Sequence, residues 1–300
     1  MRAAALLGLS SSEKDLRPFQ KESNASWFIG MPSASNEADA VLILGGDGTV
    51  HRYLAQLVKL QLPVLVVPYG SGNDFARALN LRKGQDALAA WRAFCSGADN
   101  VRTIDLGVIA PLDVSGNAKR ESKRYFCCVG GVGLDGEIAR RANQMPRWLR
   151  AHGGYAMSLL PALFRFAPFP MKITLAGREQ LEGITGETKP LILAAFANAP
   201  AYGGGLRIAP HAKLDDGKLD VCVVTDIDRF RLFCLFPTVY FGRHLSIPQV
   251  KYFQAEQLRI ETEKPLEVYA DGEYVCRTPV EVSVEHAVLR VIVPVPTDSR

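Results

Sequence analysis

The sequence predicts two domains: an α/β N-terminal domain with a parallel sheet, and a C-terminal domain that is mainly an antiparallel β-sandwich. Three observations lead to this fold class. The first hundred residues alternate strand-like apolar runs with segments of helical spacing. Two of those runs end in glycine-rich loops that open helices. From about Thr103 onward, short β-rich runs separated by turn residues dominate. The predicted domains are therefore residues 1–105 and 106–300.

Four strands are expected in the first domain. The continuous apolar runs Val41–Leu44 and Val64–Val67 are typical of parallel strands covered by helices on both faces. Between them, residues 50–60 carry apolar side chains near helical spacing, and Pro63 ends that helix. A strand, a helix and a second strand in so short a segment form a right-handed βαβ unit. The other elements expected are strands Ala3–Leu9 and Trp27–Gly30 and helices Asp74–Leu81 and Asp86–Cys95.

The second domain is predicted to consist of short strands with tight turns. Asp216-Gly217 and Asp271-Gly272 are typical hairpin turns. A helical insertion is expected over residues 137–164. The prediction leaves open whether the C-terminal end of the chain returns to the first domain. The expected strands are Ile104–Ile109, Arg124–Val129, Met171–Leu175, Leu191–Phe196, Leu219–Val224, Leu258–Glu261, Pro265–Tyr269, Val280–Val284 and Val288–Val293.

The composition bounds the class of protein. Of the 300 residues, 48% are apolar and 22% charged, which is ordinary for a folded soluble protein. The net charge of +4 is a mild excess without blocks of like charge, so nucleic acid is not an expected partner. The six cysteines show no C-x-x-C spacing, which predicts buried thiols in a reducing, cytoplasmic compartment. The most apolar later stretches, Met157–Phe169 and Leu232–Phe241, are interrupted or too short to span a bilayer.

Two loops carry the strongest functional signal. The GGDGT loop consists of Gly45, Gly46, Asp47, Gly48 and Thr49, and the GSGND loop consists of Gly70, Ser71, Gly72, Asn73 and Asp74. Each follows a predicted strand and opens a helix, where backbone N–H groups can cradle phosphate and glycine permits close approach. Two such loops in succession predict one nucleotide held at the carboxyl ends of neighbouring parallel strands.

Two side chains in these loops have competing interpretations. Asp47 can hold Mg²⁺ or orient a hydroxyl at this edge of the sheet, although Asp-Gly is also a common turn dipeptide. Asn73 is expected to cap the helix that begins at Asp74. Capping alone leaves Ser71 and the two glycines of the GSGND loop unexplained.

In this order the two loops resemble the diacylglycerol kinase catalytic domain of bacterial lipid kinases and sphingosine kinases. The resemblance covers about Asp39 to Val293 and continues through segments 105–107, 125–133, 203–205, 209–210, 216–220 and 271–273. It implies ATP-dependent phosphorylation of a diacylglycerol-like or sphingoid-like alcohol, with ATP and Mg²⁺ as cofactors. The first domain would then bind the nucleotide, and the second would bind the lipid.

The resemblance also assigns residues by position. It implies that Gly46 to Thr49 and Ser71 line the ATP phosphates. Asp216, with the main-chain oxygens of Lys213 and Lys218, would form a structural Mg²⁺ site. Glu273, beside Asp271, would accept the proton of the lipid hydroxyl.

The residues by themselves leave the carboxylate roles open. Phosphoryl transfer needs in-line positioning, Mg²⁺ on the phosphate oxygens and a carboxylate that accepts the hydroxyl proton. Asp47, Asp271 and Glu273 are the three candidates, and Glu273 is the preferred base. Asp216 has a turn role in any interpretation.

One segment departs from the family pattern. The family usually has an Asn-Pro turn after its first strand, whereas this chain has Gly8-Leu9-Ser10-Ser11-Ser12, which we call the serine turn. A serine-rich turn can still donate hydrogen bonds to phosphate, so Ser10 is included among the nucleotide-binding candidates. The nucleotide preference stays open.

The lipid side is expected over Glu137–Phe169, where arginines alternate with aromatic and aliphatic side chains. That mixture suits the surface of an anionic membrane, which predicts a peripheral membrane protein acting on a lipid substrate. A helix packed on the sandwich with its arginines in water explains the pattern equally well. A homodimer is also possible.

Two rival functions remain. An NAD kinase shares a GGDGT loop, although the GSGND loop fits lipid kinases better and the asparagine-glutamate pair expected of NAD kinases is missing after Asn198. A non-catalytic lipid- or nucleotide-binding protein of the same fold is supported by the altered serine turn, whereas the three carboxylates count against it.

Overall fold

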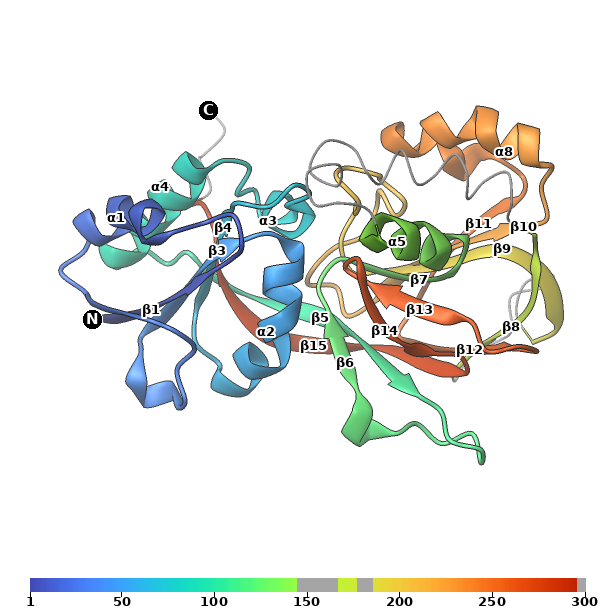
Figure 1. Cartoon of the computed structure of the whole chain (residues 1–300), viewed down its shortest axis with the longest axis horizontal. Coiled ribbons are helices and arrows are strands. Elements are labelled where there is room, and N and C mark those ends of the chain that lie inside the picture. The colour runs from blue at the N-terminus through green and yellow to red at the C-terminus, as the bar shows by residue number, and fades with distance from the viewer. Residues whose placement is uncertain (145–166, 177–185, 296–300) are drawn as a thin grey trace. The chain divides into compact units, whose positions relative to one another are not determined.

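The structure is a computed structural model, and it describes residues 1–144, 167–176 and 186–295. The chain divides into two compact units (Figure 1). Unit 1 comprises Met1–Asp105 and the C-terminal segment from His286 onward, and unit 2 comprises Leu106–Glu285. The predicted second domain, residues 106–300, included this C-terminal segment. In the structure the segment belongs to unit 1. Of the helical insertion expected over residues 137–164, residues 145–164 lie outside the described part of the chain.

Unit 1 contains a parallel sheet. Strands β1 (Arg2–Leu7), β2 (Ser26–Ile29), β3 (Ala40–Gly45) and β4 (Val64–Pro68) lie in the order β2-β1-β3-β4, and β15 (Val280–Ile292) pairs with β4. All six residues of β3 are buried, because its continuous apolar sequence is covered on both faces. The apolar runs thus become central strands, as predicted.

Helices cover both faces of this sheet (Figure 1). Helix α1 (Glu13–Lys21) contacts α4 (Gly84–Cys95) on one face, and α2 (Asp47–Leu60) lies on the other. The apolar stripe of α2, which includes Leu54 and Leu57, is buried. The short helix α3 (Asp74–Ala78) follows β4. Helix α1 was not predicted, because most of its residues are charged or polar and Pro18 lies inside it.

Unit 2 is built from antiparallel strands, as predicted. Strand β9 (Thr188–Ala197) pairs with β7 (Val129–Gly133), β8 (Phe169–Leu175) and β10 (Leu219–Thr225). The remaining ladders join β13 (Glu267–Ala270) to β14 (Glu273–Arg277) and β7, β12 (Gln257–Thr262) to β8 and β15, and β11 (Val250–Ala255) to β10. Phe126, Phe196 and Val221 are among the fully buried side chains of its core.

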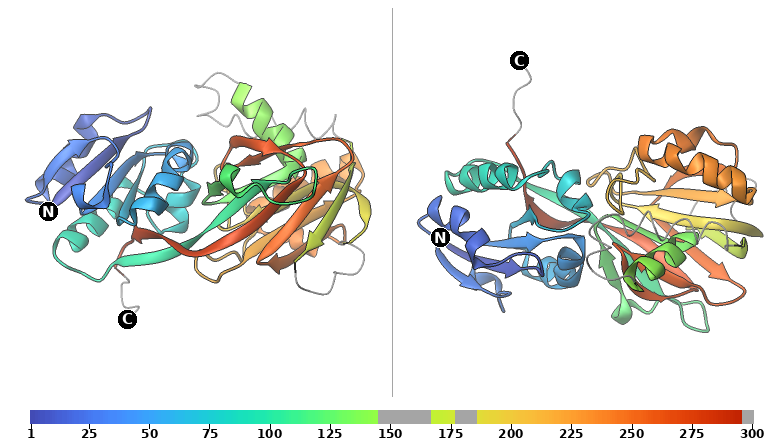
Figure 2. Two further views of the ribbon diagram at one scale, coloured as in Figure 1. Left: turned by 90° about the horizontal axis from the view of Figure 1, so that it is seen from below. Right: turned by 45° about the horizontal axis from the view of Figure 1, so that its top comes forward.

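Two long strands belong partly to each unit. Strand β5 (Val101–Pro111) pairs with β15, and the views in Figure 2 show them side by side. Where they enter unit 1, the buried Asp105 carboxylate accepts the N–H of Ala287 at 2.8 Å and lies 2.7 Å from Nδ1 of His286. The two strands predicted at Val280–Val284 and Val288–Val293 are therefore one continuous strand, β15. The prediction was wrong because local sequence patterns do not show the pairing of β15 with β12, β5 and β4 along its length.

A second correction concerns the strand predicted at Arg124–Val129. The structure has β6 (Arg124–Phe126), an interruption at Cys127 and Cys128, and then β7.

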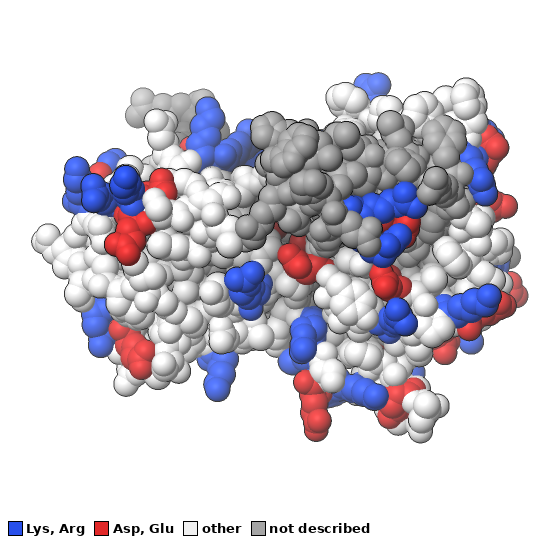
Figure 3. All heavy atoms as spheres, in the orientation of Figure 1, with Lys and Arg blue, Asp and Glu red and all other residues white. Residues whose placement is uncertain are grey.

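Among the described residues, no helix combines the length and the apolar character that crossing a membrane requires. Positive and negative side chains are interspersed over the described part of the face in Figure 3.

Candidate functional site

The two glycine-rich loops of unit 1 lie directly against each other. Strands β3 and β4 are parallel neighbours with Gly45 opposite Pro68, so the loops that follow them emerge at one edge. A Cβ added to Gly70 would lie 2.4 Å from Cα of Gly46, and one added to Gly46 would lie 2.7 Å from Cα of Gly70. Carbon atoms normally approach to about 3.5–4.0 Å. Both positions therefore require glycine because backbone packs on backbone.

Asp47 joins the two loops through hydrogen bonds. Its carboxylate accepts the N–H of Asp74 at 3.1 Å and the N–H of Phe75 at 3.0 Å. A carboxylate that receives two backbone N–H groups holds the first turn of α3 against the start of α2. The structure thus gives Asp47 a positioning role that sequence reasoning did not assign.

Asn73 does not cap its helix with its side chain, which corrects the expectation above. Its backbone is left-handed, with φ of 55°, and its side chain turns back to Gly70. The amide Oδ1 accepts the N–H of Gly70 at 2.7 Å, and Nδ2 donates to the carbonyl oxygen of Gly70. The capping role passes to Asp47 because Asn73 closes the GSGND loop on itself.

The serine turn packs beside the GGDGT loop. The N–H of Gly8 donates to the carbonyl oxygen of Leu44 at 2.8 Å, and a Cβ on Gly8 would lie 2.9 Å from Oγ1 of Thr49. The Ser11 hydroxyl donates to Leu44 and accepts the N–H of Gly8. Ser10 is exposed in this turn, so its phosphate contact stays a prediction.

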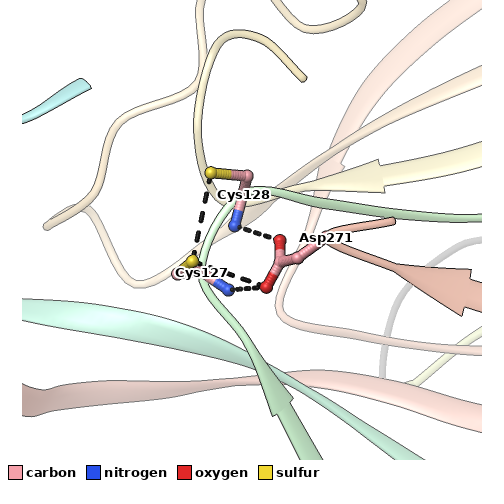
Figure 4. Close-up of side chains that lie close together, drawn as sticks. All are labelled: Cys127, Cys128 and Asp271. Carbon is pink, nitrogen blue, oxygen red and sulfur yellow. Dashed lines mark hydrogen bonds between the residues drawn. The ribbon is translucent and has the colours of Figure 1, made fainter. Parts of the chain in front are cut away.

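In unit 2, Asp271 holds the interruption between β6 and β7 (Figure 4). Its carboxylate accepts the N–H of Cys127 at 2.9 Å and the N–H of Cys128 at 2.8 Å. Sγ of Cys127 lies 3.4 Å from Oδ2 of Asp271 and 4.0 Å from Sγ of Cys128. Both oxygens of Asp271 thus serve the backbone, which explains why the predicted strand breaks at the two cysteines.

Glu273 has a different environment from the other two candidate carboxylates. It begins β14 after the Asp271-Gly272 turn and is exposed. Strand β14 pairs with β13, which in turn pairs with β7, so Glu273 is carried by a tight hairpin anchored in the sheet. No hydrogen bond or ion pair of its carboxylate is found among the described residues. Of the three candidates, Glu273 alone keeps its carboxylate outside the internal hydrogen-bond network.

Asp216 lies in an acidic pair with Asp220. Oδ1 of Asp216 accepts the N–H of Lys218 at 3.2 Å, while Nε2 of Gln254 lies 3.4 Å from oxygens of both aspartates. Asp220 also accepts the hydroxyl of Tyr252 at 2.6 Å. Burial raises the pKa of Asp220, and the charge of Asp216 adds to this effect. Carboxylate oxygens of like charge that lie close together are ligands of the kind that a hard divalent cation prefers.

The described part of the expected lipid-binding segment is helix α5 (Leu134–Gln144). Ile138 and Ala139 are buried, and Arg140 and Arg141 both pair with Glu137. Hydrogen bonds from Arg140, and then Arg141, lower the pKa of Glu137 against the opposing effect of burial. The arginines and aromatic residues of positions 145–166 lie outside the described residues.

Sequence reasoning missed an exposed aromatic surface in unit 2. Helix α8 (Arg229–Leu235) and the 3₁₀ helix η3 (Phe236–Phe241) contain no fully buried residue, and they expose Phe230 at 68% and Phe241 at 72%. Arg229, Arg231 and Arg243 are exposed in the same segment. The apolar run Leu232–Phe241 was noticed only as too short to span a bilayer, and its flanking arginines were the overlooked signal.

Comparison with known proteins covers most of the chain. Residues 6–109 match the family described as "Diacylglycerol kinase catalytic domain", and residues 129–293 match "YegS C-terminal NAD kinase beta sandwich-like domain". A protein named "Diacylglycerol kinase" from Mycobacterium tuberculosis (strain ATCC 25618 / H37Rv) is 35% identical over 256 residues, covering 85% of this chain and 77% of the relative. One of the same name from Bacillus subtilis (strain 168) is 27% identical, covering 81% and 73%.

A solved structure shares the fold. The crystal structure of a diacylglycerol kinase from Bacillus anthracis str. Sterne aligns with a TM-score of 0.65 at 19% identity, covering 97% of this chain and 96% of that one. At this identity the alignment supports the two-domain fold.

Proposed function

Since this chain belongs to the diacylglycerol kinase catalytic-domain family, whose curated relatives are lipid kinases, we propose that it transfers the γ-phosphate of ATP to the hydroxyl of a lipid. The observation that carries the proposal is the pairing of the GGDGT and GSGND loops at the ends of neighbouring strands. The acceptor is a diacylglycerol-like or sphingoid-like alcohol.

The loops of unit 1 support the phosphate-binding role. Helix α2 begins at Asp47, and the first-turn N–H groups of an α-helix have no partner within the helix itself. Those groups and the helix dipole favour an anion at this position. Gly46 and Gly70 keep side chains away from the same edge, so a phosphate can approach the backbone closely.

We assign the proton-accepting role to Glu273. Asp47 and Asp271 each accept two backbone N–H groups, so their oxygens are already engaged in holding the backbone. Glu273 is exposed at the start of β14, directly after the hairpin turn, and has no such bonds among the described residues. Asp47 and Asp271 are then positioning residues: one organises the phosphate loops, and the other orients the hairpin that carries Glu273.

The residues around Asp216 fit a divalent cation. The carboxylates of Asp216 and Asp220 are the donor type that Mg²⁺ or Ca²⁺ prefers, and the family resemblance adds the main-chain oxygens of Lys213 and Lys218. We propose that a cation there neutralises the acidic pair and stabilises the turn that contains Gly217. When bound with ATP, a divalent cation also neutralises charge on the phosphate oxygens.

We further propose that unit 2 contacts the membrane through the exposed aromatic surface of α8 and η3. Phe230 and Phe241 present large apolar side chains, and the exposed Arg229, Arg231 and Arg243 can meet anionic headgroups. This assigns peripheral membrane contact to a different segment from Glu137–Phe169, for which the sequence left membrane contact and packing on the sandwich equally open. The lipid acceptor would then be taken from the bilayer at this surface.

The test is a phosphotransfer assay with labelled ATP, Mg²⁺ and mixed micelles of diacylglycerol, monoacylglycerol, ceramide or sphingosine, with NAD as a separate acceptor. We expect label in one lipid class. In Glu273→Gln, kcat should fall by about 10²–10⁴-fold with unchanged ATP affinity, because a general base is lost and the phosphate loops are intact. Glu263→Gln, an exposed glutamate of unit 2 with no hydrogen bond or ion pair among the described residues, is the matched control. Full activity of Glu273→Gln would refute the assignment, and label in NAD alone would refute lipid phosphorylation.

A further inference from the structure

Two adjacent cysteines and an aspartate of unit 2 form a cluster of metal-ligating atoms (Figure 4). Sγ of Cys127 lies 4.0 Å from Sγ of Cys128 and 3.4 Å from Oδ2 of Asp271. The two sulfur atoms and a carboxylate oxygen of Asp271 all lie within 4.8 Å of one another. Within the described part of the chain, no other three side chains of histidine, cysteine, aspartate or glutamate come together in this way.

This arrangement is unusual for neighbouring residues, because successive side chains of a β-strand point to opposite faces of the sheet. Cys127 and Cys128 escape that alternation because they lie in the interruption between β6 and β7. Their N–H groups both donate to the carboxylate of Asp271, at 2.9 Å and 2.8 Å. The interruption thus brings two thiols to one carboxylate that lies 143 residues further along the chain than Cys128.

The distances between the three atoms suit a zinc ion. With Zn–S bonds of about 2.3 Å and a Zn–O bond of about 2.0–2.2 Å, tetrahedral ligands lie roughly 3.5–3.8 Å apart. The sulfur of Cys127 already has both neighbours close to this spacing, at 4.0 Å and 3.4 Å. The third pair, Cys128 and Asp271, lies within 4.8 Å and needs only a small adjustment of the Cys128 side chain.

The donor atoms select the metal. Thiolates are soft ligands that favour Zn²⁺, whereas Mg²⁺ and Ca²⁺ prefer sites made of oxygen alone. A carboxylate has about four lone-pair sites, so Asp271 can bind a cation and keep its two hydrogen bonds. Those bonds fix the orientation of the carboxylate, as hydrogen bonds to metal ligands commonly do.

An ion can reach this cluster in two ways. Both thiols are buried, but a zinc site of this kind is commonly loaded while the chain folds, when its ligands are still open to solvent. In the folded protein Asp271 is only partly buried. A Cβ built on Gly272, the next residue, would meet no described atom within 4 Å. The cluster is therefore open on the side of the turn at residues 271–272.

We propose that Cys127, Cys128 and Asp271 bind one Zn²⁺ ion. Binding converts both thiols to thiolates, so two protons pass to the solvent as the ion enters. Water can fill the fourth tetrahedral position. The ion would join the interruption between β6 and β7 to the turn that precedes Glu273. This inference does not depend on lipid phosphorylation, because it concerns the ligands of a metal and not the acceptor of a phosphate.

The test uses the full chain without an affinity tag and with Co²⁺ as the probe. Excess Mg²⁺ is present to fill the oxygen site proposed at Asp216. Thiolates bound to Co²⁺ give a charge-transfer absorption in the near ultraviolet, which oxygen ligands do not give. We expect this absorption to saturate at one Co²⁺ per chain and to disappear when Zn²⁺ is added. Its absence from the wild-type protein would overturn the proposal.

Cysteine variants locate the metal. Cys127→Ser and Cys128→Ser should each lose the thiolate absorption or weaken Co²⁺ binding by at least about 10-fold to 100-fold. Cys222→Ser is the matched control, because Cys222 is also a buried thiol of unit 2 but does not belong to the cluster. Cys234→Ser controls for binding at an exposed thiol. Absorption lost in either control but kept in Cys127→Ser and Cys128→Ser would overturn the assignment.

Two further measurements test the third ligand and the effect on the fold. Asp271→Asn retains one acceptor oxygen but loses the charge, so Zn²⁺ affinity should fall by at least about 10-fold, and an unchanged affinity would refute a site that includes Asp271. Saturating Zn²⁺ should raise the unfolding temperature of the wild-type protein by about 5–10 °C. The same rise in Cys128→Ser would contradict binding at this cluster.

Discussion

Replacing Gly70 by alanine is the most direct test of the contact between the two phosphate loops. The new Cβ would lie 2.4 Å from Cα of Gly46 and 2.9 Å from Oδ1 of Asn73. The backbone of Gly70 has no positive φ, so alanine meets no conformational strain there. Any loss of stability caused by the substitution therefore comes from the contact itself.

The size of the effect follows from that distance. Two carbon atoms pack at about 3.5–4.0 Å, so the loops must separate by roughly 1 Å. Cα of Gly46 belongs to the backbone, and no change of side-chain rotamer can relieve the overlap. Overpacking of this kind costs about 1–3 kcal/mol in the free energy of unfolding. A displacement of about 1 Å at a reactive group lowers kcat/KM by about 100-fold.

The assay combines urea unfolding with calorimetric titration of ATP and the lipid phosphorylation rate. The matched control is Gly84→Ala, because a Cβ there meets nothing within 4 Å, its φ is not positive, and it begins helix α4 in the same unit. We expect this control to be neutral or to gain about 0.4–1 kcal/mol. Wild-type stability and ATP affinity in Gly70→Ala would refute the glycine contact. Lost stability with unchanged ATP affinity would refute only its role in phosphate binding.

Two further predictions concern unit 2. Asp271→Ala should lower the free energy of unfolding by about 2–5 kcal/mol in urea denaturation, because two N–H groups at Cys127 and Cys128 lose their acceptor. Asp271→Asn should lose less, since asparagine tolerates φ of 51° and retains one acceptor oxygen; equal losses would contradict this account. Replacing both Phe230 and Phe241 by serine should reduce the fraction of protein that sediments with anionic vesicles by about tenfold or more. The rate of phosphorylation of a short-chain soluble acceptor should not change. Unchanged sedimentation would exclude this surface from membrane contact.

Local patterns in the sequence were sufficient for the strands and the loops of unit 1. Val41–Leu44 and Val64–Val67 are continuous apolar runs, and each must be buried on both faces to leave water. Glycine-rich loops directly after them place candidate phosphate-binding groups at one edge of a parallel sheet. The same reasoning identified the hairpin turn at Gly272, which joins β13 to β14. The hairpin predicted at Gly217 is wrong, because Gly217 lies in the long loop between β9 and β10, although its backbone is left-handed as glycine allows.

Contacts between distant residues were not accessible to that reasoning. The sequence alone could not show that Gly46 packs on Gly70, or that Asp47 replaces Asn73 as the cap of α3. It could not show that Asp271 accepts two N–H groups 143 and 144 residues earlier in the chain, which divides a predicted strand. Each of these depends on which segments the fold brings together.

The candidate site shows the same division. Residue type and turn chemistry did not rank the three carboxylates, because they do not tell whether an oxygen is already hydrogen-bonded, and the preference for Glu273 came from the family resemblance. Tertiary structure engages Asp47 and Asp271 with backbone N–H groups and leaves Glu273 exposed. It also buries His244, which has no distinguishing motif, and leaves its Nδ1 without a hydrogen-bond partner among the described residues. Periodicity and turn residues act over a few positions and determined the elements, whereas hydrogen-bond partners and burial depend on three-dimensional neighbours and were decided only by the fold.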